Sequence, residues 1–492
     1  MSNPEAENAP STEAELIAVR REKLAKLREL GVDPYGSAFE TTHTPADLRA
    51  NFADALQVKV AGRIIGLRDM GRSAFFHIGD VLGNIQGFIA VKKLPEDQLE
   101  IFRCLDRGDW IGIEGETFTT RTGEPTVKVE HFTVLAKSLR PLPDKWHGVA
   151  DRELKYRKRH LDLIANEASA ALFATRSKMV AEIRNFFHQK GYLEVETPML
   201  QSVAGGAAAR PFETHHNALG MPLTLRIAPE LFLKRLLVGG FTKLFELNRN
   251  FRNEGISRRH NPEFTMLEAY QAFADFEIMA ELVEELTCHL AETFCGGLKI
   301  EHQDENGETI RTIDLTRPWK RANYHDLVKQ AAGDDFFDLT PEQRRSRCDE
   351  LDVQISDDME DYEVIQQVFE KKIEEHTFDP CFVTRVPNEL IPLAKLSPEG
   401  KTVEVYELII NGQEISPGYS ELNDPDVQRR RLEHQAGGEE EQLVDYDFIE
   451  TLEHGMPPAG GIGIGIDRLI MMLTGAPTIR DVVLFPLLKK KE

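Results

Sequence analysis

The chain has 492 residues, of which 41% are hydrophobic, and this length suggests two to four packed domains. No apolar run approaches the roughly 20 residues of a membrane-spanning helix, and the acidic, polar start of the chain is untypical of a signal or transit peptide. The net charge of −23 argues against nucleic-acid binding over the whole surface but leaves room for a local basic face. Five scattered cysteines without a CxxC pair indicate neither a disulfide framework nor a zinc site, so we expect a cytoplasmic protein.

Residues 1–56 are predicted to form a polar tail and one basic helix. Residues 1–12 have the composition of a disordered segment. From Glu13 to Leu30, aliphatic side chains recur at helical spacing, and lysine and arginine fill most other positions. This is either an ordinary surface helix or one that presents charge to nucleic acid, and Gly31 ends it.

Residues 57–140 are rich in short strands. Five alternating or apolar runs are separated by Gly or Asp turns, and a helical stretch, Pro95 to Leu105, lies between the third and fourth runs. This order predicts a five-stranded oligonucleotide-binding barrel, the OB-fold.

Single strands bind such barrels through aromatic platforms and positive charge. Phe75 is therefore a candidate for base stacking, with Arg68 and Gln86 as readers of base or backbone. Glu124 is a weaker candidate. Phe76 points the other way on the same strand, so one of the two phenylalanines should lie in the core.

Residues 141–160 read as a linker, because a proline-containing stretch precedes a basic run that could line a path for nucleic acid. The part from 161 to 492 opens with a long helix, Ser169 to Lys190, followed by a short strand and Pro198. Further on, Glu230 lies in the first turn of another helix, where the helix dipole alone would favour an acid.

The stretch from Phe251 to Tyr270 lies between an alternating strand and a second apolar run. It mixes cations, glutamates and aromatic residues, notably Arg252, Arg258, Arg259, His260, Glu254, Glu263, Phe264 and Glu268. A solvated charged loop is the plainer interpretation. A nucleotide site is the sharper one, since arginines hold phosphate, an aromatic ring stacks on a base and carboxylates orient an amino group or a metal-bound phosphate. The flanking strands favour the second interpretation.

The segments Phe251–Gly255 (FRNEG) and Arg259–Thr265 (RHNPEFT) resemble the second signature motif of class II aminoacyl-tRNA synthetases, in the form of the bacterial-type lysyl-tRNA synthetases. The resemblance extends from about residue 15 to the C-terminus. It implies an α+β multidomain protein, in which an N-terminal OB-fold barrel binds the anticodon and a catalytic domain consists of an antiparallel sheet flanked by helices. The helix, strand and Pro198 described above resemble the first class II motif, which builds a homodimer interface.

The remaining chain supplies carboxylates and glycines. The acidic, helical segment near 334–378 is expected to be an insertion outside the chemical core. Glu407 and Glu414 flank the Asn411-Gly412 turn of an expected hairpin, and paired carboxylates beside a triphosphate suit Mg²⁺, although a solvated hairpin face would look the same. The resemblance makes these two glutamates the metal ligands.

The glycine-rich run Gly460 to Gly475 leads into Asp467-Arg468 and an apolar helix. Its spacing is wrong for a Rossmann fingerprint. It resembles the third class II motif, in which glycines admit adenine and the arginine contacts ATP phosphates. Close strand–helix packing would also explain the glycines.

The resemblance also assigns roles by position. The residues expected at ATP are Arg252, Glu254, His260, Asn261, Phe264 and Arg468, with Arg252 and Arg468 catalytic. The residues expected at lysine are Gly206, Glu230, Arg252, Glu268, Tyr270 and Glu421. A buried ammonium requires carboxylate partners, which Glu230 and Glu421 would supply. The implied partners are Mg²⁺, ATP, L-lysine, tRNA(Lys) and a second copy of the chain, and no membrane.

One position departs from the family pattern, because Pro417 replaces the usual asparagine and offers neither a side-chain donor nor an N–H. Three alternatives remain open. An aspartyl or asparaginyl enzyme of the same subclass would need cationic or amide readers instead of Glu230 and Glu421. A lysyl transferase acting on a protein would lack the N-terminal barrel. A non-catalytic nucleic-acid-binding module on a decayed scaffold would not need intact Arg252 and Arg468.

Overall fold

The computed structural model describes residues 12–142, 152–207, 209–304, 306–391, 393–436 and 444–490. The chain divides into two compact units, Met1–Ala174 and Thr175–Glu492. The predicted disordered tail up to residue 11, residues 143–151 of the predicted linker and Ala208 lie outside the described residues.

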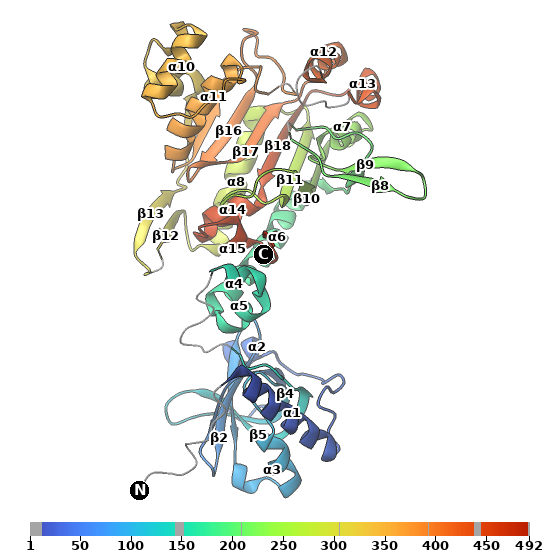
Figure 1. Cartoon of the computed structure of the whole chain (residues 1–492), viewed down its shortest axis with the longest axis vertical. Helices are drawn as coiled ribbons and strands as arrows, with labels where there is room; N and C mark the ends of the chain where they lie inside the picture. The colour runs from blue at the N-terminus through green and yellow to red at the C-terminus, as the bar shows by residue number, and fades with distance from the viewer. Residues whose placement is uncertain are drawn as a thin grey trace. The chain divides into compact units, whose positions relative to one another are not determined.

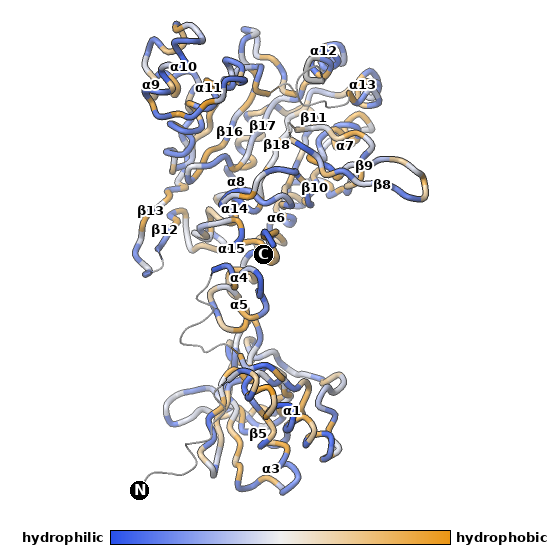
Figure 2. The backbone as a smooth tube through the Cα atoms, viewed as in Figure 1, coloured by the Kyte–Doolittle hydropathy of each residue, from blue (hydrophilic) through white to orange (hydrophobic). Residues whose placement is uncertain are grey.

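The first unit contains a closed barrel with the strand order β1-β2-β3-β5-β4, which confirms the predicted OB-fold (Figure 1). The strands are β1 (Gln57–Asp69), β2 (Ala74–Gly79), β3 (Asn84–Ile89), β4 (Trp110–Thr119) and β5 (Pro125–Ala136). The helices are α1 (Glu13–Glu29), α2 (Pro45–Ala50), α3 (Glu96–Arg103), α4 (Arg152–Arg157) and α5 (Arg159–Ala165). The barrel strands carry hydrophobic stretches (orange in Figure 2), whose inward residues form one core.

Strand β2 shows the alternation that a barrel wall requires. Phe76 is buried in the core, whereas Phe75 is half-buried and lines a hollow on the outer face. The expectation that one of the two lies inside is therefore confirmed.

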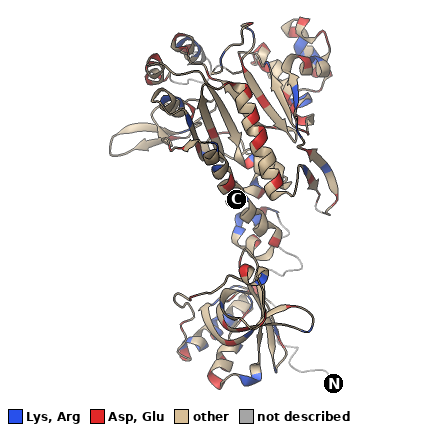
Figure 3. Ribbon diagram, turned by 180° about the vertical axis from the view of Figure 1, so that it is seen from behind, with Lys and Arg blue, Asp and Glu red and all other residues tan. Residues whose placement is uncertain are grey.

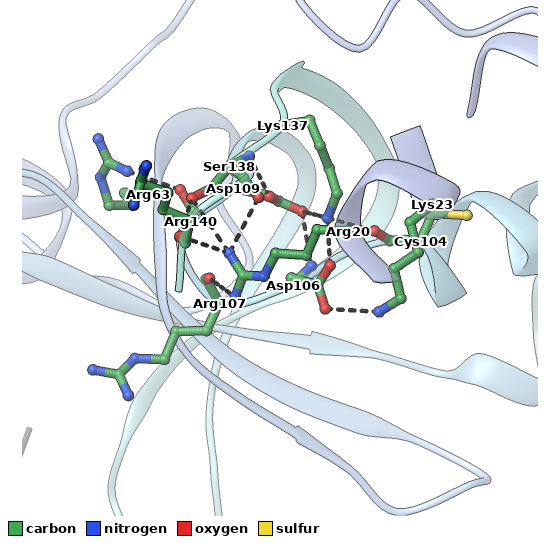
Figure 4. A network of polar contacts seen from close by, with 11 residues as sticks. Arg20, Lys23, Arg63, Cys104, Asp106, Arg107, Asp109, Lys137, Ser138 and Arg140 are labelled. Carbon is green, nitrogen blue, oxygen red and sulfur yellow. Dashed lines mark hydrogen bonds and ion pairs between the residues drawn. The ribbon is translucent and has the colours of Figure 1, made fainter. Parts of the chain in front are cut away.

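A buried polar network fastens α1 to the barrel (Figure 4). The fully buried ammonium of Lys137 donates to Asp106 at 2.5 Å and to Asp109 at 2.8 Å. On α1, the buried guanidinium of Arg20 donates at 3.0–3.1 Å to three backbone carbonyl oxygens, those of Arg107, Ser138 and Arg140. Because a buried cation is tolerated only where such acceptors replace water, these contacts make α1 part of the barrel unit.

The second unit contains an eight-stranded sheet in the order β14-β15-β16-β17-β18-β11-β10-β6, antiparallel except at its two edges. Its strands are β6 (Leu193–Glu194), β10 (Lys243–Phe251), β11 (Glu263–Ala272), β14 (Lys320–Asn323), β15 (Cys381–Thr384), β16 (Val405–Ile410), β17 (Gln413–Ser420) and β18 (Ala459–Gly465). Smaller sheets contain β7 (Leu200–Gln201), β8 (Glu213–His216), β9 (Met221–Leu225), β12 (Lys299–Gln303) and β13 (Thr309–Asp314). This antiparallel sheet with flanking helices confirms the predicted fold class.

Helices cover this sheet. They are α6 (Glu167–Gln189, which begins in the first unit), α7 (Glu230–Val238), α8 (Phe276–Phe294), α9 (Tyr324–Ala332), α10 (Pro341–Glu350), α11 (Asp361–Lys372), α12 (Pro425–Ala436), α13 (Tyr446–Glu453), α14 (Ile466–Thr474) and α15 (Ile479–Val482). Helix α8 packs across strands β16 to β18, and in Figure 3 it lies over the back of the sheet with acidic residues along it. Among the residues described, no helix has the length and apolar character needed to cross a membrane.

The short strand expected after α6 is β6, which has two residues and pairs in parallel with β10 at the sheet edge. The segment near 334–378, expected to be an insertion within the catalytic domain, packs on the sheet: Val364, Val368 and Phe369 of α11 share a core with β15 and β16. Its apolar helix face is buried against the sheet.

Candidate active site

The loop between β10 and β11, residues 252–262, forms one wall of a cavity of about 870 Å³, open mouth included. The structure brings together here all six residues expected at ATP, namely Arg252, Glu254, His260, Asn261, Phe264 and Arg468. The strands β10 and β11 pair directly across the base of this loop, so the predicted strand–loop–strand arrangement is confirmed.

Arg252 lines this cavity, with its guanidinium carbon 5.2 Å from the centre of the Phe264 ring. Burial lowers the pKa of Arg252, and the carboxylates of Glu254, Glu414 and Glu268 oppose that effect. No hydrogen-bond acceptor for its buried Nε lies among the described residues. A desolvated guanidinium with an unused donor is suited to bind an anion.

His260 and Arg468 face each other, with 2.8 Å between Nε2 and Nη2. Burial, and then the neighbouring arginines led by Arg468, lower the pKa of His260 to about 4, so the imidazole is neutral near pH 7. Because arginine can only donate, His260 Nε2 is the acceptor and Nδ1–H donates to Ser257 Oγ at 2.8 Å. A second Arg468 nitrogen donates to the Glu414 carbonyl at 2.9 Å, which holds the guanidinium at the cavity wall.

Asn261 and Asp467 are engaged with the chain itself. The buried Asn261 donates to the Glu263 carbonyl at 2.7 Å, so its side chain shapes the loop as well as lining the cavity. Asp467 accepts from Thr265 N–H at 2.8 Å and pairs with Arg176 at 2.7 Å. Sequence reasoning did not single out Asp467, which joins α14 to β11 beneath the cavity.

A second cluster consists of the buried carboxylates of Glu230, Glu268 and Glu421, on α7, on β11 and after β17. The Tyr270 hydroxyl donates to Glu268 at 2.9 Å. Burial, and then the neighbouring glutamate Glu230, raise the pKa of Glu268 to about 8; burial also raises the pKa of Glu421 to about 8. Within the described part of the chain, Glu421 Oε1 has no hydrogen-bond partner. These acids are placed to receive cations.

Two residues that sequence reasoning missed lie in this cluster. The fully buried Lys234 ammonium is 2.6 Å from Glu230 Oε1 and 2.5 Å from Glu421 Oε2. The Tyr419 hydroxyl lies 3.0 Å from both Glu230 oxygens. Lys234 follows Glu230 by four residues on α7, and this spacing was the available signal.

Glycines allow close approach to this cluster. Gly206 has φ +88°, and a Cβ there would lie 3.0 Å from the Glu230 Cβ, so the predicted glycine does meet Glu230. On β18, a Cβ at Gly461 would lie 1.8 Å from Glu421 Oε1. Strand β18 can therefore border the carboxylates only because it carries glycine at this position.

The β16–β17 hairpin turns at Asn411 and Gly412, both with positive φ, as the Asn-Gly pair predicts. Burial raises the pKa of Glu407 well above its ordinary value, and Glu414 and Glu374 raise it further. Glu374 comes from the segment expected to lie outside the chemical core, and it accepts from Glu414 N–H at 3.1 Å. In the residues that the structure describes, no three His, Cys, Asp or Glu side chains are arranged to hold a metal ion, so Glu407 and Glu414 are a pair only.

In the first unit, Arg68, Phe75 and Gln86 line one hollow of the barrel, of about 1650 Å³ including open space. Arg68 pairs across the sheet with Phe75, and Phe75 with Phe88, whose ring centre is 5.0 Å away. Sequence reasoning missed Phe88. Glu124 is instead paired with Arg49 at 3.1 Å.

Comparisons with known proteins give the same picture for both units. Residues 151–489 match the family model of class II tRNA synthetases (D, K and N), and residues 58–135 match that of OB-fold nucleic acid binding domains. A lysine–tRNA ligase of Carboxydothermus hydrogenoformans is 50% identical, over 97% of this chain and 99% of the relative. One from Pelotomaculum thermopropionicum is also 50% identical, and one from Bacillus subtilis is 47% identical, with 97% and 96% of this chain covered.

Proposed function

The chain belongs to the class II lysine–tRNA ligases, and from this premise we propose which of its residues carry out each part of the reaction. It activates lysine with ATP and transfers the lysyl group to tRNA. In the first step a lysine carboxylate oxygen attacks the α-phosphorus of ATP, which forms lysyl-adenylate and releases pyrophosphate. In the second step a tRNA 3′-terminal hydroxyl attacks the acyl carbon and AMP leaves.

This chemistry needs positioning and charge stabilisation, and no covalent nucleophile from the enzyme. We assign Arg252 to the junction of the two substrates. It lines the cavity beside Arg468, and its guanidinium also interacts with Glu268 of the carboxylate cluster. A cation in that position can hold the lysine carboxylate against the α-phosphate. Arg468 neutralises phosphate beside it, Phe264 stacks on adenine, and Glu254, His260 and Asn261 surround the nucleotide.

The observation that carries the choice of amino acid is the carboxylate cluster. Glu230, Glu268 and Glu421 are buried together, and burial, followed by the neighbouring carboxylate of Glu230, raises the pKa values of Glu268 and Glu421 to about 8. Binding of an amino acid with two ammonium groups would offset that cost. Pro417 does not interrupt the cluster, since Tyr419 on the same strand supplies the donor that contacts Glu230.

For Mg²⁺ we propose Glu407 and Glu414 as the ligands. Burial, and then the neighbouring Glu414, raises the pKa of Glu407, and such a carboxylate pair fits a hard divalent cation, which takes oxygen ligands and keeps phosphates and waters as the remainder. When bound, the ion would neutralise polyphosphate charge. The chain's own contribution is to hold Glu414 through its backbone, by Glu374 on one side and Arg468 on the other.

We further propose that the barrel face at Arg68, Phe75 and Gln86 binds the anticodon of tRNA(Lys). The protein also forms a homodimer through the edge near β6, where Leu193, Phe241 and Phe273 surround a shallow hollow with 56%, 38% and 76% of their surface exposed. All five cysteines are free, which suits a cytoplasmic location.

The decisive experiment is amino-acid-dependent ATP–pyrophosphate exchange with each of the twenty amino acids and Mg²⁺, without tRNA. Lysine alone should support exchange. Exchange with aspartate or asparagine would overturn the pocket assignment. Glu230→Gln should lose lysine activation and keep ATP binding, because the neutral amide cannot form an ion pair with the substrate ammonium. Intact lysine activation in that variant would remove Glu230 from the pocket.

A further inference from the structure

The carboxylate cluster already contains a cation of its own. Lys234 is fully buried, and its ammonium bridges Glu230 and Glu421 at 2.6 Å and 2.5 Å. Its nitrogen also lies 5.7 Å from the centre of the Tyr419 ring, whose hydroxyl holds both Glu230 oxygens. The cluster therefore consists of fixed, mutually oriented charges.

The formal charges around the site indicate what Lys234 contributes to lysine binding. The ionisable groups that face one another are Glu230 and Lys234 of α7, Glu268 and Tyr270 of β11, Tyr419, Glu421 and Arg252. Counted in their ionised forms, the three carboxylates face two cations, Lys234 and Arg252, which leaves an excess of one negative charge. Free lysine adds two ammonium groups and one carboxylate. The occupied site then has four positive and four negative charges, and the count fails if Lys234 is removed.

We propose that Lys234 is a positioning and specificity residue, an internal counter-ion that pairs with Glu230 and Glu421 and orients them so that the pocket is neutral only with a doubly cationic amino acid. The Tyr419 hydroxyl, 3.0 Å from both Glu230 oxygens, fixes the same carboxylate. The inference rests on the proposed lysine pocket and adds to it a residue that need not touch the substrate.

The geometry explains why a cation from the chain is needed. Two buried carboxylates that share one substrate ammonium would repel each other, and one would take up a proton. The resident Lys234 ammonium lies between them and opposes this protonation before substrate arrives, although burial still raises the pKa of Glu421 to about 8. Without Lys234, a proton must neutralise the extra carboxylate, and lysine binding should then shift to higher pH.

The test measures lysine-dependent exchange from pH 6.5 to 9 for full-length wild type, Lys234→Met and Tyr419→Phe. Matched controls are Lys299→Met, which removes an exposed ion pair with Asp314 in the same unit, and Tyr192→Phe, which removes a buried hydroxyl that donates to Gln271. The ATP KM and the melting temperature report on folding.

We expect Lys234→Met to raise the lysine KM at least tenfold at pH 7.5, to leave the ATP KM within twofold of wild type, and to move the pH profile of the lysine KM upward by about one unit. Tyr419→Phe should change the same parameters in the same direction, by threefold or more. The controls should match wild type.

A lysine KM and a pH profile like those of wild type in Lys234→Met would overturn the inference. If Lys234→Met does not fold, Tyr419→Phe, which keeps the aromatic ring, is the deciding variant. An unchanged pH profile of its lysine KM would refute the proposed orientation of Glu230 by fixed partners. Failure of the pocket itself is distinguishable, because Glu230→Gln would then activate lysine normally. Loss of activation in Glu230→Gln together with normal Lys234→Met would leave the pocket in place and remove Lys234 from it.

Discussion

Replacing Gly461 with alanine should damage the lysine pocket and leave the ATP site nearly intact. The new Cβ would lie 1.8 Å from Glu421 Oε1 and 2.7 Å from Tyr270 Cε1, whereas ordinary contacts begin at 3.4 Å. The carboxylate must therefore move by about 1.6 Å. Since a misplacement of roughly 1 Å can cost about 100-fold, we expect kcat/KM for lysine to fall by about two orders of magnitude, or about 2.7 kcal/mol.

Gly463→Ala is the matched control, two residues along the same strand. Its Cβ would meet the flexible end of Met266 at 2.6 Å and Pro417 only at 3.8 Å, so a rotamer change relieves the contact. Lysine and ATP kinetics in the exchange assay, with melting temperatures, compare the two variants. Equal effects of the two alanines on lysine, or a Gly461→Ala protein with the wild-type lysine KM, would refute the reasoning.

Three further outcomes are expected. The lysine KM should fall roughly tenfold between pH 7 and 8.5, because burial raises the pKa values of Glu268 and Glu421 to about 8 and their protons must leave before ammonium groups bind; a flat profile in the exchange assay would contradict this. Phe75→Ala should weaken tRNA binding roughly tenfold in a filter assay and leave exchange without tRNA unchanged, since a stacked base contributes about 1–3 kcal/mol. Phe273→Asp should shift the protein from dimer to monomer in analytical ultracentrifugation, whereas Ile310→Asp, at a residue 68% exposed on the β12–β13 hairpin, should not.

The sequence was most informative where local patterns determine structure. Alternation gave the barrel strands and the choice between Phe75 and Phe76, and the Asn411-Gly412 pair gave the hairpin turn. It was least informative where distant segments meet. Glu374 contacts Glu414 from 40 residues away, and no periodicity indicates that approach. Lys234 reads as an ordinary polar residue on an apolar helix until the fold places Glu421 beside it. The roles of the ATP and lysine residues remain predictions until they are measured.

The network around Arg20 bears on where an isolated barrel fragment should begin. From α1, Lys23 pairs with Asp106, just before β4, and Arg20 donates to Ser138, just after β5. An excised fragment that began at β1 would leave the carbonyl oxygens of Arg107, Ser138 and Arg140 without the guanidinium that now donates hydrogen bonds to them. The smallest autonomous version of this barrel therefore begins at α1, and amides in α1 and at the end of β5 should exchange with solvent as one cooperative unit.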